Sequence, residues 1–205
     1  YTVLLGLIIG GLYLANLFLM RPVSLDHYLA KNLVVDMFDS PETITHLGLV
    51  DRFNWLTQHN SKLSLDGLEK IESDLQKAVD RRRLIASYPP DSLSHRQRIT
   101  HKIALFDLDN EIRQTSDFRF HGYLLEQLSG VHLDLVEFMT DIHPIRSRAE
   151  AEDYISRIDQ FDEVFDSNLE ILAAQHREGI HPPAFVYEHV IRQLNEFLAY
   201  GHEDN

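Results

Sequence analysis

Residues 147–179 read SRAEAEDYISRIDQFDEVFDSNLEILAAQHREG and carry the clearest helical pattern in the chain. Ser147 and Glu150 have the spacing of a capping box, which opens many helices. Behind them, apolar residues recur at the three- and four-residue spacing of one helix face, at Tyr154, Ile158, Phe161, Phe165, Leu169 and Leu172. Gly179 suits the left-handed residue that ends a helix. We therefore predict one long amphipathic helix in this stretch.

The segments on both sides show similar start and stop signals. Pro182 and Pro183 precede a final helix, for which Gly201 is the predicted stop. Upstream, Ser94 and Gln97 have the spacing of another capping box. The helix that they open is predicted to carry an apolar face at Ile99, Ile103, Phe106 and Ile112.

The first half of the chain also divides into helices and turns. Residues 25–38 have helical spacing, and Ser40 followed by Pro41 predicts a new helix start. Ser64 is the predicted cap of a further helix, which ends at 88–90, where two prolines stand together. These signals predict a series of helices separated by short turns.

Alternation of apolar and polar residues typical of strands is nowhere sustained, and only residues 118–144 have a less regular pattern. We therefore predict an all-α fold. The prediction comprises an antiparallel multi-helix soluble domain over residues 22–200 and a polar tail over residues 201–205.

Residues 1–20, YTVLLGLIIGGLYLANLFLM, contain no charged side chain. At about 1.5 Å per residue, such a helix is long enough to cross a hydrocarbon core of roughly 30 Å. We predict a transmembrane anchor over residues 1–21 that holds the protein to membrane lipid as a single-pass protein. The expected location of the helical domain is the periplasmic side of a bacterial membrane. An uncleaved signal peptide and a buried core helix are the alternatives.

Gly6 and Gly10 lie four residues apart within this apolar run. This spacing lets a second helix approach closely in a membrane. We predict a helix–helix contact at these two glycines; the alternative is that glycine is simply common in membrane helices.

The charge of the chain excludes some partners. Against 19 Lys and Arg stand 32 Asp and Glu, which gives a net charge of -13. Such a surface repels the phosphates of nucleic acids, so we predict no nucleic-acid partner. The short basic run at 81–83 is predicted to be a solvated helix face paired with nearby carboxylates.

Motifs for catalysis are missing from the sequence. There is no cysteine, no His-Glu-x-x-His and no Gly-x-Ser-x-Gly. Among the twelve histidines, His132 and His143 can approach each other if the intervening segment folds back, but two positions do not make a metal site. We assign no catalytic, cofactor-binding or metal-binding residue, and we predict no cofactor for this chain.

Several strings in a fixed order resemble landmarks of the bacterial family called domain of unknown function 885. They are SPET at 40–43 with LGL at 47–49, GVHLDL at 130–135 with His143-Pro144, and EGIHPP at 178–183. The likeness runs from about residue 25 to residue 198. The resemblance implies a largely helical, exported or lipid-anchored protein similar to zinc metallopeptidases, whose histidine–glutamate metal motif lies in the C-terminal half. No metal ligand of that kind carries over to a residue of this sequence.

Two functions follow from these observations. The first is a membrane-anchored, non-catalytic helical interaction or accessory protein, a subunit of a larger membrane complex that binds a protein partner through its anchor or its helical domain. The second is the N-terminal part of a zinc metallopeptidase-like hydrolase whose catalytic half lies beyond residue 205. A free-standing enzyme within these residues is a more distant third.

Overall fold

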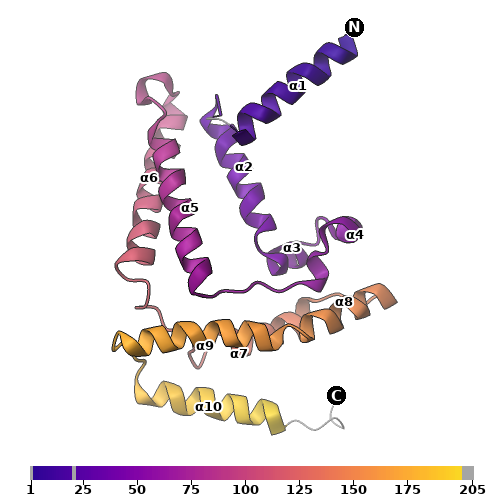
Figure 1. Ribbon diagram of the computed structural model, residues 1–205, viewed down its shortest axis with the longest axis vertical. Coiled ribbons are helices and arrows are strands. Elements are labelled where there is room, and N and C mark those ends of the chain that lie inside the picture. Colours follow the sequence, from indigo (N-terminus) through magenta and orange to yellow (C-terminus); the bar gives the residue numbers. More distant parts are fainter. Residues whose placement is uncertain (1, 20–21, 200–205) are drawn as a thin grey trace. The chain divides into compact units, whose positions relative to one another are not determined.

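The computed structural model describes residues 2–19 and 22–199, with the side chains of the first helix described in part. Throughout these residues the secondary structure is helical, apart from an isolated bridge between Leu125 and Gly130 (Figure 1). The predicted all-α class is confirmed for this part of the chain. The predicted tail at 201–205 and the predicted stop at Gly201 lie outside the described residues.

The first helix, α1 (Thr2–Leu19), covers most of the predicted anchor. Within the residues that the structure describes, we find no helix that is both apolar enough and long enough to span a membrane. Near its end α1 contacts the next helix, where the Tyr13 ring meets the His27 ring edge-on with centroids 5.6 Å apart. Gly6 and Gly10 are exposed, and a Cβ atom at either would meet nothing within 4 Å. The helix contact at these glycines stays a prediction.

The chain divides into two compact units. Unit 1 comprises residues 1–39 and 72–117, and unit 2 comprises residues 40–71 and 118–205. Each unit is therefore built from two separate stretches of sequence. The two are described in turn below.

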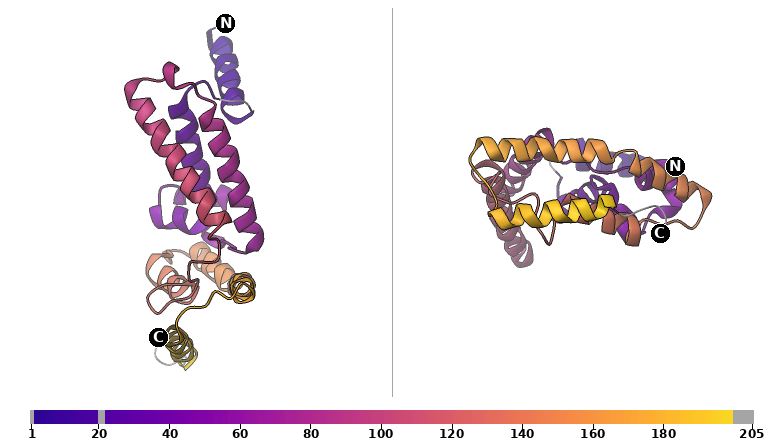
Figure 2. Two further views of the ribbon diagram at one scale, coloured as in Figure 1. Left: turned by 90° about the vertical axis from the view of Figure 1, so that its left-hand side faces the viewer. Right: turned by 90° about the horizontal axis from the view of Figure 1, so that it is seen from below.

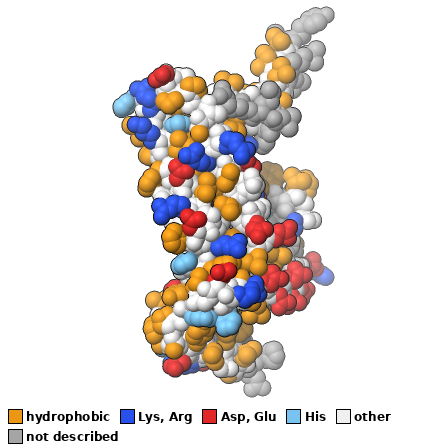
Figure 3. All heavy atoms as spheres, turned by 60° about the vertical axis from the view of Figure 1, so that its left-hand side comes forward, with side chains coloured by type: hydrophobic (Ala, Val, Ile, Leu, Met, Phe, Trp, Pro, Cys, Tyr) orange, Lys and Arg blue, Asp and Glu red, His pale blue; other side chains and the backbone are white. Residues whose placement is uncertain are grey.

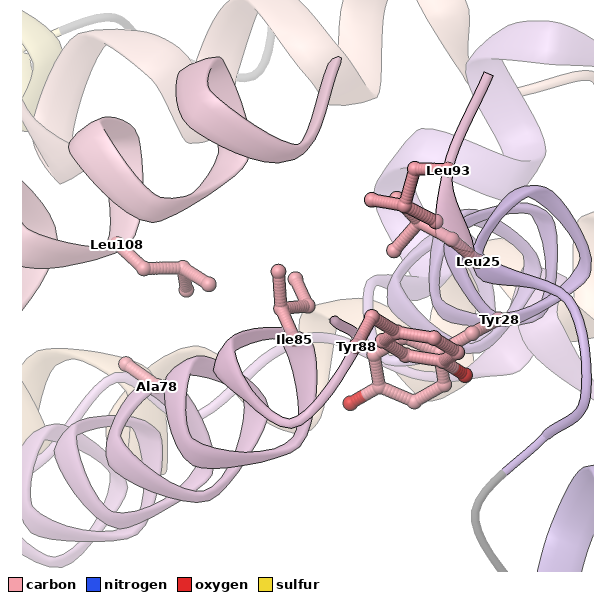
Figure 4. Close-up of a cluster of buried hydrophobic side chains, with 7 residues drawn as sticks. All are labelled: Leu25, Tyr28, Ala78, Ile85, Tyr88, Leu93 and Leu108. Carbon is pink, nitrogen blue, oxygen red and sulfur yellow. The ribbon is translucent and has the colours of Figure 1, made fainter. Parts of the chain in front are cut away.

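Unit 1 places three long helices side by side, α2 (Leu25–Phe38), most of α5 (Leu68–Ala86) and α6 (His95–Ser116) (Figures 1 and 2). Apolar side chains from all three and from the loop after α5 meet between them (Figure 4): Leu25, Tyr28, Ala78, Ile85, Tyr88, Leu93 and Leu108. The Tyr88 hydroxyl is also paired, because it donates to the Pro22 carbonyl at 2.6 Å. The core of this unit is therefore apolar, and the buried hydroxyl of Tyr88 has an acceptor.

Helix α6 begins as the sequence predicts but buries a different face. Ser94 and Gln97 form the complete capping box. The predicted apolar face is wrong at Ile99, Ile103 and Phe106, which are half to two-thirds exposed. Ile112 does pack against the core, as predicted, and the other residues of α6 that pack there are Ala104, Leu105 and Leu108. Apolar residues stand on more than one side of this helix, so spacing alone did not identify the buried side.

The basic run at 81–83 is paired, as predicted. Arg81 bonds Asp36, Arg82 bonds Asp109 at 2.6 Å, and Arg83 bonds Asp80 at 3.1 Å. Figure 3 shows side chains of both charges interleaved with exposed hydrophobic ones on the face that it presents. These contacts lie at the surface of unit 1, where each ion pair contributes little.

Unit 2 is assembled from shorter pieces joined by turns. The first stretch holds α3 (Pro41–Leu47) and α4 (Asn54–Thr57), with one-turn 3-10 segments at Asp51–Phe53 and His59–Ser61. The second holds α7 (Val131–Glu137), which runs into a π-helical turn at Phe138–Ile142, then α8 (Arg148–Ile158), α9 (Phe161–Arg177) and α10 (Ala184–Ala199). Two apolar clusters pack these pieces together, one centred on Phe138 and one on Ile171.

The long helix predicted behind Ser147 is in fact two helices, so that prediction is wrong at its centre. The chain breaks between Ile158 and Phe161, where the Gln160 side chain donates to Ser156 O at 2.5 Å and to Ser61 O at 2.8 Å. Its amide oxygen accepts from Leu63 N at 3.0 Å. At this break the Gln160 side chain therefore bonds the segment at residues 61–63. The end of α9 is as predicted, since Gly179 has φ +72°.

The predicted capping box at Ser147 forms only in part. The Ser147 hydroxyl accepts from Glu150 N at 3.2 Å, as a cap does. The Glu150 carboxylate, however, accepts from Arg146 N at 2.6 Å and pairs with the Arg146 side chain. The basic neighbour thus takes the carboxylate that a full capping box would use.

Candidate functional site

A partly open cavity of about 660 Å³ lies within unit 2. We call it the groove. Its lining comes from α3, from residues 63–66, from residues 124–142 and from the first half of α9. Four of its apolar residues belong to the core of the unit: Leu63, Leu135, Phe138 and Val164. The groove thus has an apolar floor made by four separate parts of the chain.

One wall of the groove is fixed by Glu42 in the first turn of α3. The helix starts at Ser40, whose hydroxyl accepts from Thr43 N at 3.2 Å, and Pro41 occupies its first position. This start directs the Glu42 carboxylate onto Ser64, which donates its backbone N–H and its hydroxyl, each at 2.6 Å. The prediction that Ser64 caps a helix is therefore wrong: Ser64 ties the irregular segment before α5 to α3, and the next helix begins at Leu68.

The opposite wall depends on the turn at 124–130. Gly130 adopts φ +121°, and a Cβ atom there would lie 2.9 Å from the Leu124 carbonyl oxygen. Only glycine accepts this conformation and this approach without a shift of the backbone. The Gly130 N–H donates to the Asp134 carboxylate at 3.3 Å, so the turn and α7 are held together.

A cluster of buried polar side chains lies at the centre of unit 2, with Arg157 of α8 fully buried in it. The guanidinium donates to Lys62 O at 2.9 Å, to His59 O at 2.8 Å and to Thr45 Oγ1 at 2.7 Å. It also lies over the Phe138 ring, 4.7 Å from the centroid. Burial lowers the pKa of Arg157 to about 10, while Glu42 and Asp153 act to raise it, so the side chain is charged at neutral pH.

A further N–H of Arg157 meets His143 and indicates which nitrogen of that ring carries the proton. The His143 Nε2 lies 3.1 Å from Glu150 O, which only accepts, so Nε2 carries the proton. Nδ1 is then free to accept from Arg157 at 2.7 Å. Burial, with the charge of Arg157 adding to it, lowers the pKa of His143 below its usual value. The imidazole is neutral and serves as an acceptor for the buried cation.

His59 and Asn60 complete this buried cluster. The Asn60 amide oxygen accepts from Thr45 Oγ1 at 2.8 Å, and His59 lies 2.6 Å from Thr57 Oγ1. Burial lowers the pKa of His59 although the nearby Asp51 opposes the change. The contacts of the cluster lie within the 40–62 stretch, between that stretch and α8, and between α8 and the residues His143 and Phe138. The cluster therefore stabilises the fold of unit 2.

The structure does not bring the two histidines considered for a metal site together. His132 lies 3.1 Å from the Gln193 side chain, whereas His143 lies at Arg157. His176 and His181 have ring centroids 5.0 Å apart. Within the described ranges we find no group of three or more His, Cys, Asp or Glu that could hold a metal ion.

Sequence reasoning missed Arg157, although a signal for it exists. The residue lies three positions after Tyr154 and four before Phe161, so it shares the apolar face of the predicted helix. A charged residue on such a face is seldom fully buried unless its donors are paired. Arg157 was therefore recognisable as a buried cation, but its partners were not.

Comparisons with known proteins give one match. The family model for a bacterial protein of unknown function (DUF885) matches residues 41–205. No curated protein and no solved structure matches the chain. All of the groove residues except Ser40 fall inside the matched range.

Proposed function

Since this chain belongs to the DUF885 family of bacterial proteins, we propose that it is a non-catalytic helical interaction module that holds a partner in the groove of unit 2. The observation that carries this proposal is the groove itself, which lies almost wholly within the family's matched range. Its volume of about 660 Å³ falls within the usual span of binding clefts.

The hydrogen bonds of the walls favour binding over catalysis. The hydroxyl of Ser64 donates to Glu42, and that of Ser40 lies near Glu42 and Thr43. These hydroxyls therefore fasten the wall. A wall with its polar groups already paired is preorganised, which reduces the ordering cost of binding.

A photo-crosslinking amino acid in place of Leu47 tests this proposal. Leu47 lines the groove and is 44% exposed. Leu169 on α9 is 58% exposed and outside the lining, so it is the matched control. Irradiation in living cells is expected to give a discrete adduct at position 47 and none at position 169. Equal adducts at both positions, or none at either, would contradict a binding role for the groove.

We also propose that the protein is attached to a bacterial membrane, as a subunit of a larger membrane complex, with its helical part on the periplasmic side. The support is the uncharged run at 1–20. Because the chain has no cysteine, Gln114→Cys introduces a single thiol. It is expected to react with a membrane-impermeant maleimide in cells whose outer membrane is permeabilised, and the protein is expected to remain in carbonate-washed membranes. Recovery in the soluble fraction would overturn this attachment.

A second candidate is the N-terminal part of a zinc metallopeptidase-like hydrolase, as the family resemblance suggests. The described residues do not fit a zinc site, because no group of three suitable side chains converges. Metal ligands would then come from residues encoded after Asn205. Stoichiometric zinc in the protein purified from its natural source, together with a His-Glu motif encoded there, would favour this candidate; a metal-free protein would count against it.

A further inference from the structure

We propose that the groove binds a polypeptide segment that carries Lys or Arg side chains next to apolar ones. This inference rests on the proposed function, because it names the chemistry of the partner that the groove would hold. It follows from three features of the groove: the negative charge of its lining, the positions of the carboxylates along it, and its apolar floor.

The lining of the groove is acidic. It includes four carboxylates, Glu42, Asp66, Asp134 and Glu137, and contains neither Lys nor Arg. The other ionisable side chain in it is His46. A partner with negative charge would meet these carboxylates across a partly desolvated space, which costs free energy, whereas a cation is attracted.

Two of the carboxylates are held in place and keep room for a further donor. Glu42 accepts two hydrogen bonds from Ser64 and a longer one of 3.4 Å from the Ser40 hydroxyl, and Asp134 accepts one from Gly130 N. An ionised carboxylate has about four acceptor sites, so each can still accept from a Lys or Arg side chain. Buried Arg157 offsets part of the charge of Glu42 from behind, but it does not line the groove.

The positions of these carboxylates, spread along the groove, favour an extended cationic partner over a single metal ion. Among the residues that the structure describes, the carboxylates form no group able to hold a metal. They come from α3, from the segment after Leu63 and from two positions of α7. Charges spread in this way suit several cationic groups along one chain better than a single divalent ion.

The apolar floor of the groove favours a partner that also carries apolar side chains. Leu63, Leu135 and Val164 are buried side chains at the base of the groove, and Leu47 at its edge is 44% exposed. Apolar side chains of the partner would remove the exposed part of Leu47, and what is left of the floor, from water, which favours binding. A purely hydrophilic cation would leave the floor uncovered.

Three fluorescein-labelled peptides test the proposal by fluorescence anisotropy with the full chain. The first alternates leucine with lysine and arginine, the second replaces each leucine by glycine, and the third replaces each basic residue by glutamate. We expect the first peptide to bind most tightly and its affinity to fall with added salt. The second is expected to bind more weakly, and the third not to bind.

Charge variants locate the binding. Glu137→Gln removes an exposed carboxylate of the groove, and Glu163→Gln removes an exposed carboxylate of α9 outside the lining. We expect Glu137→Gln to weaken binding of the first peptide roughly twofold to fivefold, as for the loss of an exposed ion pair. Glu137→Lys is expected to weaken it further, and Glu163→Gln to leave it unchanged.

Several outcomes would overturn the inference. They are equal binding of the basic and acidic peptides, equal binding of the leucine and glycine peptides, equal effects of the two glutamate variants, or no binding at a peptide concentration of about 1 mM. If an adduct still forms at position 47, the groove remains a binding site and only the cationic partner is wrong. If that adduct is also missing, the proposed function falls as well.

Discussion

Each of the two units buries a small core, but the side chains that make up the two cores differ in chemistry. In unit 1 the centre is made of side chains such as Leu25, Ile85 and Leu108, and the charged residues stay at the surface. In unit 2 the centre also contains Arg157, with donors directed at Lys62 O, His59 O and Thr45. Long regular helices satisfy their own backbone, whereas short helices and turns leave carbonyl groups that need a donor.

The largest effect is expected from Arg157→Met, which removes that donor. It leaves two carbonyls, Thr45 Oγ1 and His143 Nδ1 with fewer partners in a buried place, so we expect a loss of about 3–5 kcal/mol in the free energy of unfolding. Hydrogen exchange followed by mass spectrometry should show the loss of protection in α3 and α8, with α6 retained.

Arg148→Met on the same helix is the matched control. The Arg148 side chain is 92% exposed, so this variant is expected to stay within about 0.5 kcal/mol of the parent protein. If the two variants unfold alike, the contrast between the units is wrong.

A smaller loss in the free energy of unfolding is expected from Ile85→Ala in the apolar core of unit 1. Ile85 is 2% exposed, and truncation leaves a cavity that costs about 2–4 kcal/mol. Urea unfolding measures the loss, and exchange should increase in α5 and α6. Ile103→Ala removes the same atoms from a side chain that is 55% exposed, so a comparable loss there would argue against the assigned core face.

The helix caps compare the units on a smaller scale. Ser94→Ala removes a complete capping box in unit 1 and is expected to cost about 1 kcal/mol. Ser147→Ala removes a single hydrogen bond to Glu150 N, because Arg146 holds the Glu150 carboxylate. We expect the second loss to be smaller in thermal unfolding. The reverse order would contradict the described caps.

The smallest effect is a dependence of unit 2 on pH. Burial lowers the pKa of His59 and of His143, although Asp51, Asp153 and Glu150 oppose this. The unfolded chain therefore takes up protons first as the pH falls below the ordinary value near 6.5. We expect stability to be full above that pH and to fall below it, and His143→Gln to flatten the dependence in urea unfolding between about pH 7 and pH 5. An unchanged slope would contradict the description of this ring.

The sequence predictions are correct where the interactions join residues close together in the sequence, and wrong where they join distant ones. The starts at Ser40 and Ser94 and the stop at Gly179 are correct because caps and turns depend on residues a few positions apart. The break at Gln160 was missed because its side chain bonds residues 61 and 63, almost a hundred positions away. No local pattern contains that partner.

The groove could not be predicted for the same reason. Glu42, Ser64 and Asp134 come together only when four separate parts of the chain fold. Carboxylates are so common here that none stands out in the sequence. The burial of α6 also needed tertiary context, because its isoleucines and leucines lie on more than one side.

The separations within the Arg157 contacts have a consequence for synthesis on the ribosome. Arg157 bonds groups that lie 95 and 98 positions earlier, at Lys62 and His59, so the first stretch of unit 2 leaves the ribosome long before its cation. At about 5–20 residues per second, that wait is roughly 5–20 s. Unit 1 has all of its segments by residue 117, so it can fold first while residues 40–71 wait. During that interval the carbonyl groups of Lys62 and His59 lack the donor that Arg157 supplies in the folded unit.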